Sequence, residues 1–384
     1  MANNNDKKVL NVPALRFPEF TGEWMKCKFG KIATGFDYGM NAAAKPYDGQ
    51  NKYIRITDID EVSSTYNNSS IVSPDGILSE NYVVNEGDIL LARTGASTGK
   101  SYLYRKSDGK LYYAGFLIRA NVAEHNPYFV FSQLHTHRYW RWVSIMSARS
   151  GQPGINSLEY ASFPIFTTTL KEENKISSLL SLIDKRIATQ NKIIEDLKKL
   201  KSAIRKMIFT SLKNEHTENC EINQLLAYEQ PSEYIVTNDE YSADTTLTPV
   251  LTANKGFVLG YTNENFGIYK KGECIIFDDF TMDAKYVSFP FKVKSSAIKI
   301  LTAKPNVNLR FMFEYLSYLE LKSEEHKRHY ISEIASLIIE LPSKEKQSRI
   351  AYLMTSLDNK LVLEENTMAR YMDEKQYILS QMFI

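Results

Sequence analysis

The chain has 384 residues, 43% of them hydrophobic and 24% charged, which describes an ordinary soluble globular protein with more than one domain. Its net charge is only +2, so a nucleic-acid-binding surface would have to come from local clustering of basic residues. Cys27, Cys220 and Cys274 are well separated and offer neither a disulfide framework nor a CxxC metal pair, as suits a reducing cytosol. The polar start MANNNDKKVL and the absence of an apolar run of about eighteen residues argue against secretion and membrane spanning, so we expect a cytoplasmic protein.

The first part of the chain reads as a tail followed by a mixed domain. Residues 1–20 are polar and then interrupted by Pro13 and Pro18, which indicates a tail or a strap that lies on another part of the chain. Turn signals then separate strand-like runs at 52–60, 81–95, 100–105 and 110–122. A helix is expected from Pro127, which suits a first helical turn. We therefore expect an α+β domain over residues 21–167.

A long helix is expected over residues 168–213. Apolar residues recur alternately four and three positions apart from Ile176 to Ile208, which is the 3.5-residue period of a coiled coil. No Gly or Pro interrupts this pattern, so the helix would run about 55 Å. Residues 171–213 hold eleven Lys/Arg against five Asp/Glu, which a solvated helix face or a surface for partners or DNA would both explain.

The second part of the chain repeats the first. Strand-like runs occur at 232–236, 248–253, 256–262, 272–281, 285–294 and 297–303, and a helix is expected at 309–322. A second long helix over 343–384 repeats the apolar seam 174 residues later, with Asp358 in the place of Asp184. A repeat of this length indicates a duplicated protein, with the second α+β domain at 214–342.

Two apolar seams of equal length can bury each other. We therefore expect an α+β fold in which two similar globular domains are separated by an antiparallel intramolecular coiled coil, in a pseudo-two-fold, circular arrangement. Matching the polar interruptions of the seams pairs Lys201 with Glu364 and Gln190 with Lys375, although solvated positions at a helix edge would explain these four residues equally well. A rigid spacer of about 55 Å can accommodate two DNA half-sites about 34–36 Å apart.

This order of elements resembles the specificity (S) subunit of type I restriction–modification systems over essentially the whole chain. The resemblance is carried by the stretches at 11–24, 87–100, 173–187 and 346–361, and in the second domain by those at 228–236, 248–262 and 275–281. It implies two target-recognition domains that read the two halves of a bipartite, asymmetric double-stranded DNA target. It also implies that the long helices set the spacing and dock two DNA adenine methyltransferase (M) subunits, with restriction/translocase (R) subunits in the larger complex. No catalysis is expected in this subunit.

Candidate DNA contacts in the first domain come from a Gly/Ser/Thr loop and from a basic, aromatic stretch. The loop at 95–101 has three residues between its glycines where a nucleotide-binding P-loop needs four, yet its N–H groups and cations could hold a DNA phosphate. A tight hairpin with exposed charges is an equal alternative. The candidate residues are Arg93, Thr94, Ser97, Thr98 and Lys100.

The stretch at 135–142 combines basic and aromatic residues. Arg138 and Arg141 lie three apart on one helix face and could reach a phosphate. His135 and His137 are two apart and face different directions, so we expect no metal site. Trp140 or Trp142 is expected in the core. Asn126-Pro127 looks like part of an amino-methyltransferase motif but lacks its second proline, and a helix start is the better interpretation.

Candidate contacts in the second domain lie near turns. Asp can accept a hydrogen bond from cytosine, Asn can recognise adenine, and Lys can bind guanine or phosphate, although hydrogen bonding to a loop backbone would explain the acidic pair equally well. The candidates are Thr252, Asn254, Lys255, Tyr261, Asp278, Asp279 and Thr281. No cofactor motif, catalytic set or metal set can be assembled from the sequence. The alternative function is a non-catalytic structural adaptor, with a coiled-coil strut and protein-binding end domains.

Overall fold

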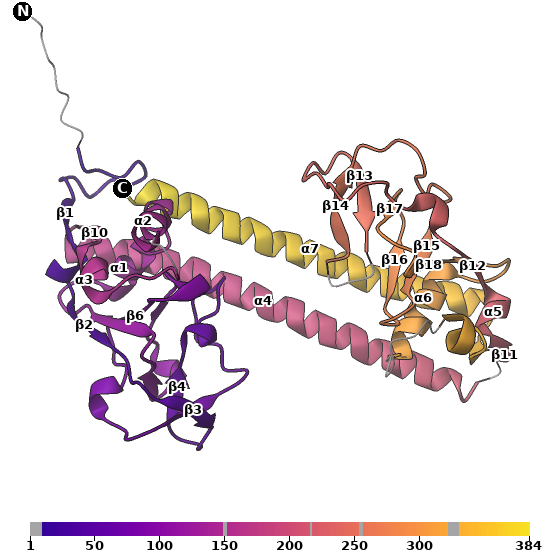
Figure 1. The fold of residues 1–384 in the computed structure, drawn as a ribbon, viewed down its shortest axis with the longest axis horizontal. Coiled ribbons are helices and arrows are strands. Elements are labelled where there is room, and N and C mark those ends of the chain that lie inside the picture. The colour runs from indigo at the N-terminus through magenta and orange to yellow at the C-terminus, as the bar shows by residue number, and fades with distance from the viewer. Residues whose placement is uncertain (1–9, 149–151, 216, 253–255, 322–329) are drawn as a thin grey trace, which may run out of the picture. The chain divides into compact units, whose positions relative to one another are not determined.

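The computed structural model describes residues 10–148, 152–215, 217–252, 256–321 and 330–384. The chain divides into two compact units, the first made of residues 1–190 with 367–384 and the second of residues 191–366. Each unit contains one mixed domain and one end of each of two long helices, α4 (Leu170–Leu212) and α7 (Lys344–Met382) (Figure 1). Among the residues described, none of the helices combines the length and apolar composition that crossing a membrane requires.

The first unit is built on a four-stranded antiparallel sheet of order β2-β9-β6-β7. Its elements are β1 (Met25–Lys28), β2 (Thr34–Tyr38), β3 (Ala43–Pro46), β4 (Lys52–Ile54), β5 (Val72–Asp75), β6 (Asp88–Ala92), β7 (Ser101–Leu103), β8 (Leu111–Tyr113), β9 (Leu117–Asn121), α1 (Pro127–Gln133), α2 (His137–Ser147), α3 (Ser157–Ser162) and β10 (Pro164–Thr167). Because side chains alternate along β6, Ile89 and Leu91 face the helices, whereas Leu90 and Ala92 face a second core around Tyr102. Strand β6 is therefore buried on both faces.

The helix expected after Asn126 is two helices. Asn126 caps α1 by accepting hydrogen bonds from the N–H groups of Tyr128 and Phe129. The chain leaves the helical path after Gln133, and Thr136 caps α2 by accepting from the N–H of Tyr139. The apolar pattern continues through this break, because both helices cover the same core, so periodicity alone did not reveal it.

The second unit repeats the same sheet, of order β12-β18-β15-β16 and again antiparallel throughout. Its elements are β11 (Glu218–Glu221), α5 (Ile222–Leu225), β12 (Leu226–Glu229), β13 (Thr248–Leu251), β14 (Val258–Thr262), β15 (Cys274–Asp278), β16 (Ala284–Val287), β17 (Lys292–Val293), β18 (Ile298–Ala303), α6 (Leu309–Tyr318) and β19 (Ile338–Leu341). Strand β15 alternates between two cores as β6 does, with Ile275 and Phe277 on the face of the helices. The duplication expected from the sequence therefore extends to the strand order.

Each domain begins and ends in a two-stranded antiparallel sheet, β1-β10 in the first unit and β11-β19 in the second. In the first unit the residues before β1 lie against the helix ends: the N–H of Leu15 donates to Gln381 O at 2.9 Å, and Arg16 makes a bidentate contact with Glu172 at 2.7 and 2.8 Å. This is the strap position expected for residues up to 20, of which 1–9 lie outside the described residues.

The helix segments run antiparallel within each unit, but in a register different from the expected one. Lys375 pairs with Asp184 at 2.7 Å in the first unit, and Lys201 pairs with Asp358 in the second. Each lysine thus meets an acid six positions before its expected partner, Gln190 or Glu364. For Lys375, a carboxylate neutralises the partly buried ammonium group better than the amide of Gln190 would, and the two acids Asp184 and Asp358 already corresponded in the sequence repeat.

Candidate nucleic-acid interface

A groove of about 610 Å³ opens in the first domain beside the end of β6. We call it the Arg93 groove. The side chains and backbone that line it come from four separate stretches: 38–44, 53–57, Arg93 and 114–116. Its exposed members include Tyr38 and Phe116, at 41% and 57% exposure. The groove thus combines aromatic faces with polar groups and a cation.

The wall of the groove is a close backbone contact. Met40 N donates to Tyr113 O, and Gly115 N donates to Met40 O, both at 2.8 Å. A Cβ added at Gly39 would lie 2.2 Å from Ala114 O, so only glycine allows the two segments to approach this closely. Tyr53 fixes the same wall by donating its hydroxyl to Met40 O at 2.8 Å.

The guanidinium of Arg93 lies 4.8 Å from the centre of the Tyr38 ring. Its Nε is buried and has no hydrogen-bond partner among the described residues. Hydrogen bonding by the side chain and the N–H of Ser157, together with the nearby Arg93, lowers the pKa of Tyr38 against the opposing effect of burial. The other arginine of the groove, Arg55, is neutralised by a bidentate contact with Asp58, with both bonds at 2.8 Å.

Much of the Gly/Ser/Thr loop has structural contacts instead of a free phosphate-binding face. The buried Thr98 donates its hydroxyl to Gly95 O at 2.8 Å, and Thr94 forms a bridge with Gly154. Lys100 lies 3.4 Å from the exposed Glu61. Ser97 is half-buried and supplies a carbonyl to Lys100 N. Of the five candidates in this region, Arg93 is the one whose side chain lines the groove.

Arg138, a candidate phosphate contact, makes structural contacts within the first domain. It donates to Pro164 O at 2.8 Å and lies over the rings of Phe163 and Phe166. Burial lowers its pKa to about 10. Sequence reasoning placed it correctly on a helix but could not see that this face packs against β10. Arg141 is exposed and stays a candidate.

The other residues of this stretch are structural. Both ring nitrogens of His135 have partners, Phe131 O and Ser64 Oγ at 3.0 Å each, and burial lowers its pKa to about 4. Trp142 packs against Tyr139 and neighbouring rings, whereas Trp140 is 42% exposed.

The acidic pair of the second domain, two candidate DNA contacts, is bound within the domain. Asp278 is buried and accepts from the N–H groups of Phe280 and Thr281 at 2.8 and 3.1 Å. Asp279 is buried as well, and it pairs with Lys299 at 3.3 Å and accepts from Tyr330 N at 2.9 Å. Both acids therefore stabilise the turn after β15, the alternative that the sequence had left open.

Other candidates of the second domain lie at its surface or outside the described residues. Thr281 is exposed, and Tyr261 is half-buried in β14 and bridged to Ser242. Thr252 donates its N–H to Phe257 O at 2.9 Å, at the base of the turn between β13 and β14. Asn254 and Lys255 lie outside the described residues.

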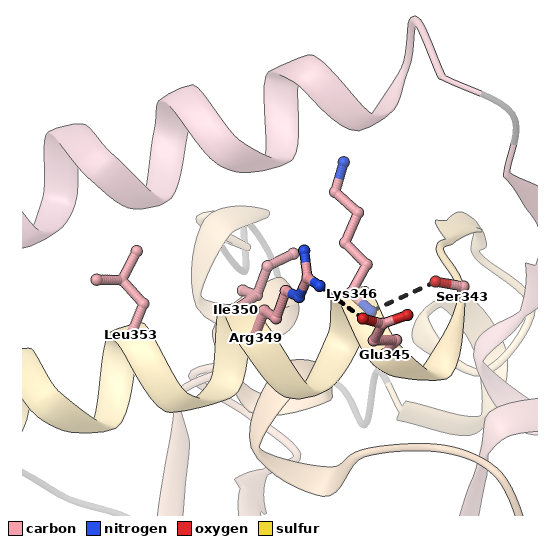
Figure 2. Close-up of a pocket in the computed structure, with 6 residues that line it drawn as sticks. All are labelled: Ser343, Glu345, Lys346, Arg349, Ile350 and Leu353. Atoms are coloured by element: carbon pink, nitrogen blue, oxygen red, sulfur yellow. Dashed lines mark hydrogen bonds and ion pairs between the residues drawn. The ribbon is translucent and has the colours of Figure 1, made fainter.

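A second hollow lies on the first turns of α7 in the second unit. Figure 2 shows its lining residues, which are Ser343, Glu345, Lys346, Arg349, Ile350 and Leu353. Arg349 pairs with Glu345 at 2.6 Å, but both side chains are at least 75% exposed, so the pair contributes little to stability. This hollow is a charged helix surface with an apolar floor, and it offers a contact area rather than an enclosed site.

Sequence reasoning missed the aromatic members of the Arg93 groove. Tyr38 follows a bulge in β2, at which Gly35 and Phe36 have φ of 90° and 60°. A bulge of this kind redirects the following side chain. The Gly-Phe-Asp-Tyr sequence at 35–38 carried a weak signal of this, because glycine before an aromatic residue in a strand is typical of a bulge.

Comparison with known proteins places this geometry in a family context. Residues 214–370 match the model of the type I restriction modification DNA specificity domain. The chain is 39% identical over 172 residues to the Escherichia coli type I restriction enzyme EcoR124I/EcoR124II specificity subunit, an alignment that covers 41% of either chain. It thus spans less than half the length of that relative.

Two further similarities extend over more of the chain. It is 24% identical over 326 residues to a putative type I restriction enzyme MjaX specificity subunit of Methanocaldococcus jannaschii, with 77% of both chains covered. Its fold is similar to the crystal structure of a type I restriction–modification S subunit from M. genitalium, with a TM-score of 0.63 at 14% identity, over 97% of this chain and 99% of that one. The resemblance drawn from the sequence is confirmed: residues 214–370 match the type I restriction modification DNA specificity domain, and the chain is similar to type I specificity subunits.

Proposed function

We propose that this chain is the DNA-specificity subunit of a type I restriction–modification complex. The single observation that carries the proposal is the repeated architecture of the two units. Each unit has the same four-stranded antiparallel sheet order and holds a segment of both long helices in antiparallel contact. Two similar readers attached to one spacer suit a partner with two recognition sites at fixed spacing.

The two readers are the domains at 21–167 and 214–342. The second contains most of the matched specificity domain, which supports DNA recognition there. The first has the same framework, and its Arg93 groove supplies a cation and aromatic groups. At the end of the equivalent strand the first domain has Arg93 in a groove, whereas the second domain has the buried Asp279, so the two domains present different side chains there and the target is asymmetric.

The chain supplies recognition, while two DNA adenine methyltransferase subunits supply methylation and restriction/translocase subunits supply cleavage. The helices offer the surface for this assembly. Large apolar side chains are exposed on both, among them Leu182 and Met207 on α4 and Tyr352 on α7, at 63%, 67% and 77% exposure. A methyltransferase subunit that lies along the helices would cover such side chains.

The proposal is tested by producing the full chain together with a type I adenine methyltransferase subunit from the same cell and mapping the methylated adenines in the host DNA. We expect methylation within one bipartite, asymmetric sequence. The methyltransferase produced without this chain is the control and should leave that sequence unmethylated. A complex that forms but methylates no bipartite sequence and protects no two-part footprint would favour the structural-adaptor alternative.

A further inference from the structure

We propose that Arg93 determines specificity for a guanine in the half-site read by the first domain, with Tyr38 as its positioning residue. This inference rests on the function proposed above. It changes the role expected for Arg93, from a phosphate contact that is blind to sequence into a base contact.

The first step is the unsatisfied state of Arg93. Other arginines of the first unit have protein acceptors: Arg16 contacts Glu172, Arg55 contacts Asp58, and Arg119 contacts Asp37. Arg93 has no ion pair with a carboxylate in the described part of the chain, and its Nε is buried without a partner there. The Nε atoms of Arg138 and Arg310 are also unpartnered among the described residues, but Arg93 differs from them because it lines an open groove. A desolvated donor without an acceptor is costly, so we infer that an acceptor from outside the chain completes this site.

The second step is preorganisation. The Tyr38 ring lies 4.8 Å from the guanidinium carbon and limits its rotation, and the Tyr38 hydroxyl is itself held by Ser157 N at 3.3 Å. The backbone of Arg93 is fixed on both sides, because its N–H donates to Phe116 O at 3.0 Å and its carbonyl accepts from Ile155 N at 2.9 Å. A planar fork of donors is thereby presented in one orientation before DNA arrives.

The third step is the chemistry of the surroundings. A phosphate contact needs an exposed cation that reaches outward, as Arg141 does. Arg93 instead lines a groove with the exposed ring of Phe116 and the exposed polar side chains of Asn41 and Thr57. Guanine presents two acceptors, O6 and N7, on one edge, which an arginine fork contacts with two hydrogen bonds. Flanking aromatic and polar groups suit neighbouring base edges and sugars.

The experiment uses the complex of the full chain with its methyltransferase subunits and measures methylation rates on DNA carrying each base at every target position. For Arg93→Ala we expect a loss of about 10- to 100-fold in the preference for guanine at one position of one half-site, with the other half-site unchanged. Arg93→Lys keeps the charge and should also relax that position. Arg141→Ala is the matched control and should leave every base preference unchanged.

Tyr38→Ala should relax the same position less strongly, whereas Tyr38→Phe should restore the preference, because it keeps the ring. Uniform weakening by Arg93→Ala over all sequences, with a smaller salt dependence of DNA binding, would assign Arg93 to a phosphate and overturn the inference. If neither half-site contains a G·C pair, the inference is overturned, even where Arg93→Ala fails to fold. If the wild-type complex shows no bipartite target at all, the proposed function itself fails, which is a separate outcome.

Discussion

The two domains share a framework and differ at one informative place, the end of the central strand. In both sheets this strand alternates its side chains between two cores, and the residue two positions after the helix-facing Leu91 and Phe277 is Arg93 in the first domain and Asp279 in the second. Arg93 lines an open groove and lacks an acceptor for Nε among the described residues, whereas Asp279 is buried, pairs with Lys299 and accepts from Tyr330 N. The same backbone position thus serves recognition in one copy and turn stability in the other.

The domains also differ in how they are attached to the long helices. In the second unit the fully buried Glu314 of α6 accepts hydrogen bonds from Arg205 and Arg310, and Asp358 joins the cluster. In the first unit the sixth residue after the capping asparagine is Ser132, where the second unit has Glu314. Ser132 only donates to Tyr128 O, at 2.7 Å. At this helix position the second attachment is therefore ionic and the first is neutral.

The largest expected effect breaks this ionic attachment. Glu314→Ala leaves the guanidinium groups of Arg205 and Arg310 without their buried acceptor, so we expect a loss of about 3–5 kcal/mol in the stability of the second unit. Ser132→Ala at the matching position of the first unit is the control and should cost no more than about 1 kcal/mol. Hydrogen exchange resolved by unit measures both. Equal losses in the two units would contradict the difference in attachment.

A pH titration should distinguish the two units by the pH at which each loses stability. The pKa of His135 falls to about 4 because burial disfavours the cation, so the unfolded chain, with a His pKa near 6.5, binds this proton first. The first unit therefore loses stability as the pH falls from about 6.5 towards 4, by about 2 kcal/mol, because the ring keeps some contact with water. Groups that face this ring are Ser64, Lys375 and Asp184.

In the second unit the loss of stability in acid occurs at a lower pH. Burial opposes ionisation of Asp358, but hydrogen bonds from Lys201 and Arg310 prevail and lower its pKa. The stability that this carboxylate contributes is present above its ordinary pKa of 3.8 and is lost as the pH falls below it, through the lowered value. His135→Gln should remove the loss in the first unit between pH 6.5 and 4, while the exposed His137→Gln should leave it. A loss that persists in His135→Gln would show that another group is responsible.

A smaller effect on stability is expected at the end of the central strand. Asp278→Ala leaves two backbone N–H groups of the turn without their acceptor, so we expect the second unit to lose about 1–3 kcal/mol. Arg93→Ala removes a side chain with no carboxylate partner in the described chain and should change the stability of the first unit by less than about 1 kcal/mol. Denaturant unfolding of each variant measures these values. A larger loss for Arg93→Ala would make it a structural residue.

The smallest expected effect concerns Arg141. As an exposed cation on α2 it should contribute one phosphate contact, so Arg141→Ala should weaken DNA binding a few-fold for all sequences and lower the slope of log K against log salt by about 1. Binding to specific and to random DNA over a range of salt concentrations measures this. An unchanged slope would remove Arg141 from the interface.

The features of the domains that the sequence predicts are those that depend on local patterns of residues. The 3.5-residue period predicted both long helices, and the 174-residue repeat predicted that the strands of the second unit would follow those of the first. The sequence did not predict the break between α1 and α2 because the apolar pattern continues through it. Thr136, which precedes a helical stretch, was nevertheless a usable capping signal. The capping role of Asn126, in contrast, was correctly indicated by the proline that follows it.

The sequence by itself determined that this protein is a duplicated α+β chain with two long helices, because periodicity and internal repetition depend on residues close in sequence or at one fixed offset. Tertiary structure alone decided that Lys201 and Lys375 meet Asp358 and Asp184, that Arg138 packs against β10, that Asp279 is buried, and that Tyr38 lies under Arg93. These contacts join residues from separate stretches of the chain. Whether a charged side chain faces solvent or a buried partner depends on that packing, and it cannot be deduced from the residue type.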